Sequence, residues 1–323
     1  SGLFQITQNR PTVCQFLNLK ITANVSGQTG ISMTGEALQN THSTMMLYMN
    51  GVTMREGTAN FNRAITLKYI YNGVIDGCMF YASTDHATGP YAIELLTDSS
   101  TVAAAMNLAI SNCNLNGWER GLSLVGNSGF GPKGYNEGIS ISNSLIINVL
   151  YGIYFKTPYD ELRSTGLYLD NTHIDARGTN CEALHLENWE GVFLNNCYLT
   201  IGAVGTGNAV VLGQQIAGTQ ILGCKFNING NYGIALLNPS SSINDCNSNP
   251  IGCIGVQILG CSFEGAPSQS TVYLDTLCMS CTVQNNSHYY RCGSPYPNTV
   301  QMTAITLGSN DTTGGTRNNS VQT

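Results

Sequence analysis

The side chains best suited to chemistry gather between residues 118 and 190 of the 323-residue chain. Carboxylates, aromatic rings and cations share this stretch, at Trp118, Glu119, Arg120, Tyr154, Lys156, Asp160, Glu182, His185, Glu187 and Trp189. Two carboxyl groups that flank a bond can divide the acid and base steps of its cleavage between them. Rings pack on the apolar faces of a ligand, and cations donate hydrogen bonds to its oxygen atoms. These residue types predict acid–base chemistry on a hydroxyl-rich ligand.

A repeated segment supplies the framework for these side chains. Seven stretches share a template of alternating residues followed by Asn or Gly and then a small residue, at 74–78, 109–113, 140–144, 168–172, 193–197, 220–224 and 257–261. Their last residues recur every 25 to 37 positions. The Asn or Gly position indicates a sharp bend in left-handed conformation, which these two residues tolerate best. Stacking of this bend predicts a ladder through Asn112, Asn143, Asn171 and Asn196.

A second recurring strand, of the type Gly-Ile-x-Leu, follows each template. It occurs at 92–95, 121–124, 152–155, 183–186, 209–212, 233–236 and 271–274. With the short strand between them, three strands per repeat and period-2 alternation predict an all-β, right-handed parallel β-helix, a solenoid of three sheets. We expect it to span 1–289, with irregular turns at 10–72 and regular ones at 73–289. The tail 290–323 is interpreted as a cap or an oligomerisation arm.

The cysteines fit this repeat rather than a disulfide framework. Five of the twelve occupy the last template position, at Cys78, Cys113, Cys197, Cys224 and Cys261. Stacked side chains with parallel Cβ vectors are poorly placed for bridging, so we expect buried free thiols. Cys278 and Cys281 have metal-ligand spacing, but no second pair accompanies them. We therefore expect no metal site and no cofactor.

Charge and hydropathy argue against two classes of partner. The net charge of -6 leaves no basic stripe for nucleic acid, and no apolar run is long enough to span a bilayer. The chain opens with Ser1 and Gly2 rather than Met and shows no secretory signal. This start predicts a trimmed fragment whose preceding region is missing.

The alternation of the two strand types resembles the pectin-lyase-like β-helix superfamily, which includes polygalacturonases, pectate lyases and bacteriophage tailspikes. The resemblance covers residues 10–289 and rests on strands such as Gly-Ile-Ala-Leu at 233–236 and Ala-Ile-Ser-Asn-Cys-Asn-Leu at 109–115. The polygalacturonase series Asn-x-Asp, Asp-Asp, Gly-His-Gly and Arg-x-Lys is missing. Free cysteines and an Asn-, Ser- and Gly-rich body are more similar to the central domain of a tailspike.

A tailspike resemblance implies a homotrimer that binds and cleaves a bacterial surface polysaccharide, either capsule or O-antigen. It implies a location on the virion tail, acting at the bacterial cell surface, with the rest of the tail joined through the missing N-terminal region. Leu222 and Leu259 occupy outward positions, where a monomeric solenoid usually carries polar residues, and this also favours a trimer.

In the superfamily that it resembles, the substrate groove runs along the Gly-Ile-x-Leu sheet. The period-2 alternation then predicts which side chains of this sheet face outward: Glu94, Ser123, Tyr154, His185, Val211, Ala235 and Tyr273. Two residues further along, the outward stripe is Leu96, Val125, Lys156, Glu187, Gly213, Leu237 and Asp275. The segments 126–137, 157–161 and 188–190 leave the same side of the sheet and are expected to wall the groove.

Paired carboxylates on this sheet predict glycoside hydrolysis. Successive turns of the solenoid are spaced by about 4.8 Å, so Glu119 and Glu182, two turns apart, approach the roughly 6.5 to 9.5 Å that inversion requires. Glu187 with Asp160 or Glu161 is the competing pair. Rings for stacking on sugars are Trp118, Tyr154 and Trp189, and the donors to hydroxyl or acidic groups are Arg120, Lys156 and His185.

Two other functions remain open at this point. A polysaccharide lyase would use Tyr154, Lys156 or His185 as the base that removes the proton alpha to a uronate carboxylate. A glycan-binding protein without catalysis would need the aromatic and cationic groups but no carboxyl pair. A second charged cluster at Asp170, His173, Asp175 and Arg177 falls on the other two sheets and is interpreted as a trimer contact or a solvated surface.

Overall fold

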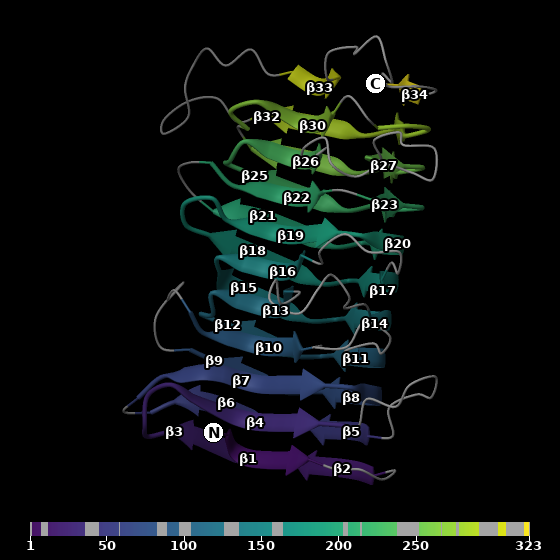
Figure 1. Ribbon diagram of the computed structural model, residues 1–323. Helices are drawn as coiled ribbons and strands as arrows, with labels where there is room; N and C mark the ends of the chain where they lie inside the picture. The colour runs from purple at the N-terminus through teal and green to yellow at the C-terminus, as the bar shows by residue number, and fades with distance from the viewer. Residues whose placement is uncertain are drawn as a thin grey trace.

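The structure is a computed structural model whose strands form one right-handed parallel β-helix (Figure 1). It describes residues 2–7, 12–35, 45–57, 59–82, 89–96, 105–125, 136–156, 164–202, 206–213, 215–237, 252–265, 267–275, 278–290, 303–307 and 320–322. Each turn of the solenoid, here called a rung, contributes one strand to each of three parallel sheets. In these residues no helix is long and apolar enough to cross a membrane. The predicted fold class is confirmed.

Sheet A contains the Gly-Ile-x-Leu strands. Its strands are β1 (Gly2–Thr7), β4 (Gln28–Thr34), β7 (Phe61–Lys68), β10 (Tyr91–Leu96), β13 (Arg120–Val125), β16 (Tyr151–Lys156), β19 (Glu182–Glu187), β22 (Asn208–Leu212), β26 (Tyr232–Leu236), β30 (Ser270–Leu274) and β33 (Thr303–Leu307). Neighbouring rungs pair in parallel with the same positions opposite one another, as in Ile93 with Leu122 and Leu122 with Ile153.

Sheet B contains the first half of each template. Its strands are β2 (Thr12–Leu17), β5 (Met45–Asn50), β8 (Ile70–Asp76), β11 (Ala105–Ser111), β14 (Glu137–Ser142), β17 (Ser164–Asp170), β20 (Trp189–Asn195), β24 (Gln220–Leu222), β28 (Gln257–Leu259), β31 (Thr282–Gln284) and β34 (Ser320–Gln322), with β23 (Ile216–Ala217) and β27 (Cys253–Ile254) beside the main path.

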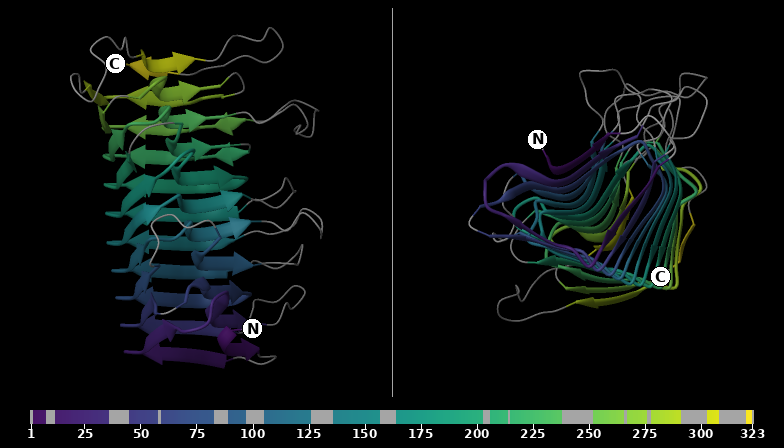
Figure 2. Two further views of the ribbon diagram at one scale, coloured as in Figure 1. Left: turned by 90° about the vertical axis from the view of Figure 1, so that its left-hand side faces the viewer. Right: turned by 90° about the horizontal axis from the view of Figure 1, so that it is seen from below.

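Sheet C contains the short strands after the bend. Its strands are β3 (Lys20–Ala23), β6 (Thr53–Glu56), β9 (Met79–Tyr81), β12 (Asn114–Asn116), β15 (Leu145–Val149), β18 (His173–Arg177), β21 (Tyr198–Gly202), β25 (Lys225–Ile228), β29 (Ser262–Gly265) and β32 (Ser287–Tyr290). Seen along the axis, the three sheets enclose one interior (Figure 2). Inward residues such as Ile153, Leu169 and Ile174 fill it and are essentially inaccessible to solvent.

The bend between sheets B and C holds a left-handed residue on successive rungs, as predicted. Asn112, Asn143, Asn171 and Asn196 have φ values of 54°, 48°, 45° and 50°. The ladder continues with positive φ at Asn18, Gly51, Gly77, Gly223, Gly260 and Asn285. Neighbouring amides support one another, since Asn171 Nδ2 donates to Asn143 Oδ1 at 2.7 Å. Gly and Asn are required here because other side chains are strained at positive φ.

The five template cysteines point into the core as free thiols, as predicted. Each is buried, and the thiols of Cys197 and Cys224 donate to the carbonyl oxygens of Asn195 and Leu222 at 3.4 and 3.5 Å. Cys14, Cys181, Cys253, Cys278 and Cys281 are buried free thiols as well. The cysteines therefore serve as small core residues, and backbone oxygens accept the weak hydrogen bonds of the five template thiols.

The regions on either side of the regular rungs belong to the same sheets. Strands β1 to β9 form three complete rungs, with register shifts between Gln28 and Thr29 and between Met45 and Leu47. In the tail, β33 continues sheet A and β34 continues sheet B.

Replacing Asn171 by Val should lower the free energy of unfolding by about 1 to 3 kcal/mol, because a β-branched residue is strained at positive φ. The Asn171→Gly variant also loses the amide but can adopt the bend, so it should lose less. Chemical denaturation followed by circular dichroism measures both. Equal stability of the Val and Gly variants would show that the left-handed bend does not govern this position.

Candidate active site

Sheet A presents three outward columns of side chains, because its strands are paired in register. The acid–aromatic face is defined here as the outward residues of β7, β10, β13, β16 and β19. Its first column is Arg63, Tyr91, Arg120, Tyr151 and Glu182, and its middle column is Thr66, Glu94, Ser123, Tyr154 and His185. The third column includes Lys68, Leu96, Lys156 and Glu187. The register confirms that the predicted middle stripe is one column across the rungs, but its members Ser123, Val211 and Ala235 are buried.

Three charged residues of β19 form a tight cluster with Lys156. His185 Nδ1 lies 2.7 Å from Glu182 Oε2, and His185 Nε2 lies 2.9 Å from Glu187 Oε1. Lys156 Nζ, one rung earlier, lies 3.5 Å from the same Glu187 oxygen. Glu182 and Glu187 are therefore held on opposite sides of one imidazole ring. Their side chains are only 16% and 8% exposed, which strengthens the ion pairs by excluding water.

The two carboxylates decide the charge of His185. Burial, the largest single influence, opposes protonation, but hydrogen bonds and charge from Glu182 and Glu187 together raise the pKa of His185 to about 9. The imidazole is therefore protonated at neutral pH and donates from both nitrogen atoms. Tyr154 lies 4.7 Å from it, ring centre to ring centre, on the preceding rung. Burial raises the pKa of the Tyr154 phenol, so that group stays neutral.

Arg120 lies among three tyrosine rings on the same face. Its guanidinium carbon is 4.4 Å from the Tyr154 ring centre, 4.7 Å from Tyr91 and 5.7 Å from Tyr151. Nη1 donates to Ser123 Oγ at 3.2 Å. Arg63 repeats this arrangement two rungs earlier, with its guanidinium carbon 3.8 Å from the Tyr91 ring centre. Cation–π contacts of this kind hold the rings flat beside the charges.

Glu119 lies at the bend before β13 and is half enclosed. Its Oε2 accepts a hydrogen bond from the backbone N–H of Gly89, which precedes β10, and its Oε1 is 3.5 Å from Arg120 Nε. The carboxyl is thus turned toward the rung of β10, whereas Glu182 lies two rungs away on β19. This geometry favours Glu187, rather than Glu119, as the partner of Glu182.

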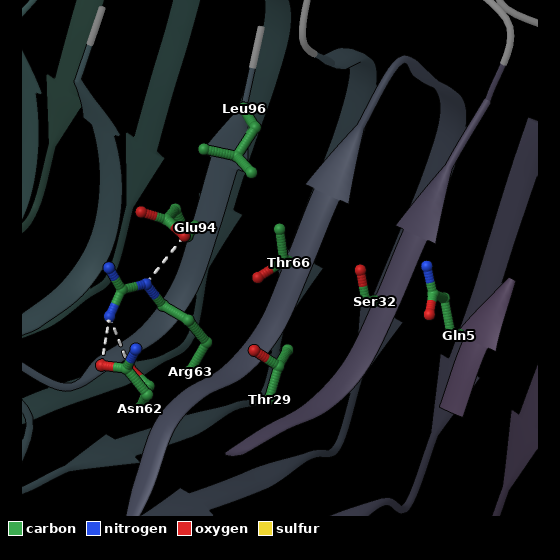
Figure 3. A pocket seen from close by; sticks show the side chains of 8 residues that line it. All are labelled: Gln5, Thr29, Ser32, Asn62, Arg63, Thr66, Glu94 and Leu96. Atoms are coloured by element: carbon green, nitrogen blue, oxygen red, sulfur yellow. Dashed lines mark hydrogen bonds and ion pairs between the residues drawn. The ribbon is translucent and has the colours of Figure 1, made fainter. Parts of the chain in front are cut away.

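A hollow of about 330 Å³ continues the acid–aromatic face toward the N-terminal rungs (Figure 3). It is lined by Gln5, Thr29, Ser32, Asn62, Arg63, Thr66, Glu94 and Leu96, from β1, β4, β7 and β10. Arg63 closes one side through a 2.7 Å ion pair between its Nε and Glu94 Oε2. Apart from Leu96, uncharged polar side chains form the rest, which gives hydroxyl and amide groups for hydrogen bonds to a ligand.

The two tryptophans predicted to stack on sugars are buried, and that part of the prediction is wrong. Trp118 is inaccessible to solvent, and its Nε1 donates to the Phe80 carbonyl at 2.9 Å. Trp189 is inaccessible as well and stacks on Phe155 with ring centres 5.3 Å apart. Both rings fill the core because a large apolar surface is most stable there. The accessible rings of the face are tyrosines.

Other predicted site residues divide into those that the structure places and those that it does not describe. Arg120, Tyr154, Lys156 and His185 all lie on the acid–aromatic face. Asp160 and Glu161, the competing partners of Glu187, lie outside the described residues, as do most of the segments expected to wall the groove.

Arg63 and Tyr91 belong to the face but were missed from the sequence. They stand three residues before the middle column, at the position that Arg120, Tyr151 and Glu182 occupy on later rungs. Following that earlier strand position along the repeats would have revealed them. Among the residues that the structure describes, no group of three or more His, Cys, Asp and Glu side chains is arranged to hold a metal ion.

No known protein family and no curated protein matches this sequence. Solved structures share its fold. A family 28 exopolygalacturonase from Yersinia enterocolitica superposes with a TM-score of 0.58 at 11% identity, over 90% of this chain and 48% of that one. The enzymatically active domain of tailspike protein 2 from bacteriophage CBA120 gives 0.55 at 13% identity, over 92% and 42%.

These likenesses define the class of the protein as a right-handed parallel β-helix of the kind found in pectin-lyase-like enzymes and phage tailspikes. The chain spans less than half of either solved chain. A shared fold does not carry an activity with it, so function is argued from the acid–aromatic face.

His185 should titrate in the folded protein with a pKa of about 9, above the value of about 6.5 for an unfolded histidine. Because the folded pKa is raised, the ion pairs stabilise the fold fully below about pH 6.5, and this contribution is lost as the pH rises through about 9. NMR titration of the imidazole protons measures the pKa of His185, and the Glu187→Gln substitution should lower that pKa. A folded pKa at or below that of unfolded histidine would contradict the bridged arrangement.

Proposed function

We propose that this protein binds a bacterial surface polysaccharide along the acid–aromatic face and hydrolyses it with Glu182 and Glu187. The observation that supports this most directly is the pair of carboxylates held on either side of the His185 imidazole, next to accessible tyrosine rings. Tyr91, Tyr151 and Tyr154 offer ring edges and hydroxyl groups to a sugar, because neighbouring rungs cover their ring faces. Arg120 and Lys156 donate to hydroxyl or acidic groups.

The cluster suggests how protons move during hydrolysis. Glu182 passes a proton, received from His185 Nδ1, to the glycosidic oxygen as its bond to the anomeric carbon breaks. Glu187 takes a proton from the water that forms the new bond to that carbon. Glu187 then releases this proton to solvent, and a solvent proton returns to His185 Nδ1 through Glu182, so the starting charges are restored and only water is consumed. Glu119 is the third carboxylate of the proposal, and it can accept hydrogen bonds from the hydroxyl groups of a neighbouring sugar.

Elimination fits this cluster less well than hydrolysis. A lyase base must be unprotonated at working pH, whereas the pKa of His185 is raised to about 9 and that of Tyr154 is also raised. Binding without turnover is the second candidate, since the ion pairs of Glu182 and Glu187 also suit a face that only holds a glycan.

Glu182→Gln and Glu187→Gln should each reduce depolymerisation by about 100- to 10,000-fold while leaving polysaccharide binding nearly unchanged. The melting temperature should fall moderately at neutral pH, because His185 loses one of its two ion pairs. Product length is followed by gel electrophoresis, and ultraviolet absorbance detects the unsaturated ends that a lyase would make. Glu264→Gln on β29 of sheet C is the matched control and should be fully active. Full activity of both sheet A variants, and of Glu119→Gln, would remove this site from consideration.

We also propose a homotrimer on a virion tail that acts at the bacterial cell surface, with further tail regions preceding this chain. Support comes from the shared tailspike fold and from apolar groups on the outer side of sheet B. Tyr168 is 48% exposed and stacks on Phe193 at 5.2 Å, and Leu222 and Leu259 lie half-buried on later rungs. Apolar groups of this kind mark contacts between chains.

Light scattering of the purified protein at micromolar concentration should give the mass of three chains. Exclusion of water from the sheet B side chains favours this association. A mass of one chain at that concentration would contradict the trimer without affecting the assignment of the acid–aromatic face.

A further inference from the structure

A second hollow, of about 600 Å³, lies on the outer side of sheet C over β18, β21 and β25, which are adjacent in Figure 1. Its floor is one column of side chains together with Asn229, because Asp175 pairs in register with Thr200 and Thr200 with Asn227. Pockets of this size hold ligands of one or a few rings.

The floor consists of oxygen atoms that lack hydrogen-bond donors. Asp175 Oδ1, Thr200 Oγ1, Asn227 Oδ1 and Asn229 Oδ1 are each buried and have no partner in the described part of the chain. Asp175 is 6% exposed, so its carboxylate is held below the surface. Buried acceptors without donors are costly, and four around one hollow call for donors from outside the chain.

The walls of the hollow are of two kinds. On one side, the His173 and Tyr198 rings stack with centres 4.7 Å apart at an interplanar angle of 22°. On the other side, Arg177 binds Asp175 Oδ2 through Nε at 2.9 Å and Nη2 at 2.7 Å. Arg177 lies over Gly202, where a Cβ atom would come within 3.1 Å of its side chain. Glycine at 202 thus leaves room for the arginine beside the floor.

We propose that this hollow is a second carbohydrate-binding site, which takes a hydroxyl-rich sugar. Sugar hydroxyls donate to the unpaired oxygens of the floor, while the edges of the stacked His173 and Tyr198 rings contact the apolar part of the sugar. A cation suits the hollow less well, because Arg177 already neutralises the Asp175 carboxylate. The site is on sheet C rather than on the acid–aromatic face, and it would hold the polysaccharide without cleaving it.

The test compares variants that remove the acceptors and keep the shape. Wild type, Thr200→Val and Asn227→Leu are applied to an array of immobilised capsular polysaccharides and O-antigens, and the dissociation constant is measured for each glycan that wild type retains. Each variant should bind about five- to tenfold more weakly, the loss typical of one hydrogen bond. Their melting temperatures should be unchanged or higher, since an unpaired buried oxygen is removed. Thr282→Val on β31 of sheet B is the matched control and should bind like wild type.

The outcomes separate this site from the proposed catalytic function. Weaker binding by both sheet C variants supports the site even where no bound glycan is cleaved, a result that would refute only the catalytic proposal. Unchanged affinity in both variants, or no glycan bound by wild type, overturns the site. Two further results would overturn the assignment to a sugar. A Ca²⁺-dependent rise in melting temperature that Thr200→Val abolishes would make the hollow a cation site, and a loss of oligomer mass in that variant would make it a contact between chains.

Discussion

Each rung hydrogen-bonds to the next in the same register, and the remaining features of the molecule depend on this parallel pairing. It repeats every outward position at about 4.8 Å, so a residue type chosen at one position meets its counterpart on the neighbouring rung. Asparagines at the bend between sheets B and C can therefore support one another, as Asn143 and Asn171 do. The same pairing leaves each buried position only the space that the rung above and the rung below allow.

Stacking also brings charged groups within reach of one another, which must be paired to be stable. On β16 and β19 the sequence meets this demand with Lys156, His185, Glu182 and Glu187 in one cluster. On β7 and β13, the guanidinium groups of Arg63 and Arg120 lie against the Tyr91 ring instead. The result is a rigid face on which acids, donors and rings have fixed positions. Such preorganisation is what both glycan binding and acid–base catalysis require.

The fold and the outward columns of sheet A were predictable because they follow from a repeat. The left-handed bend at Asn171 and the buried thiol of Cys197 each recur at the same position on other rungs, so the repeat itself indicates their environment. Trp118 and Trp189 were misplaced because they stand at the entrance to strands, where alternation does not decide between core and solvent. Burial of a large ring prevailed at both positions.

The partners of the carboxylates were less predictable than their columns. Glu182 and Glu187 both bind the imidazole of His185. This contact depends on side-chain rotamers, which the sequence repeat does not determine. The unpaired oxygens of Asp175 and Asn227 are likewise visible only once three rungs of sheet C are stacked. Sequence periodicity fixes which way a side chain points, but not which neighbour it binds.

The central claim is that the acid–aromatic face of sheet A is where a polysaccharide is bound and cleaved. A crystal structure of the Glu187→Gln variant with an oligosaccharide of the bound glycan tests it most directly. We expect sugar rings against Tyr91, Tyr151 or Tyr154, with a glycosidic oxygen within hydrogen-bond distance of Glu182. An oligosaccharide bound elsewhere on the protein, with this face of sheet A empty, would contradict the account.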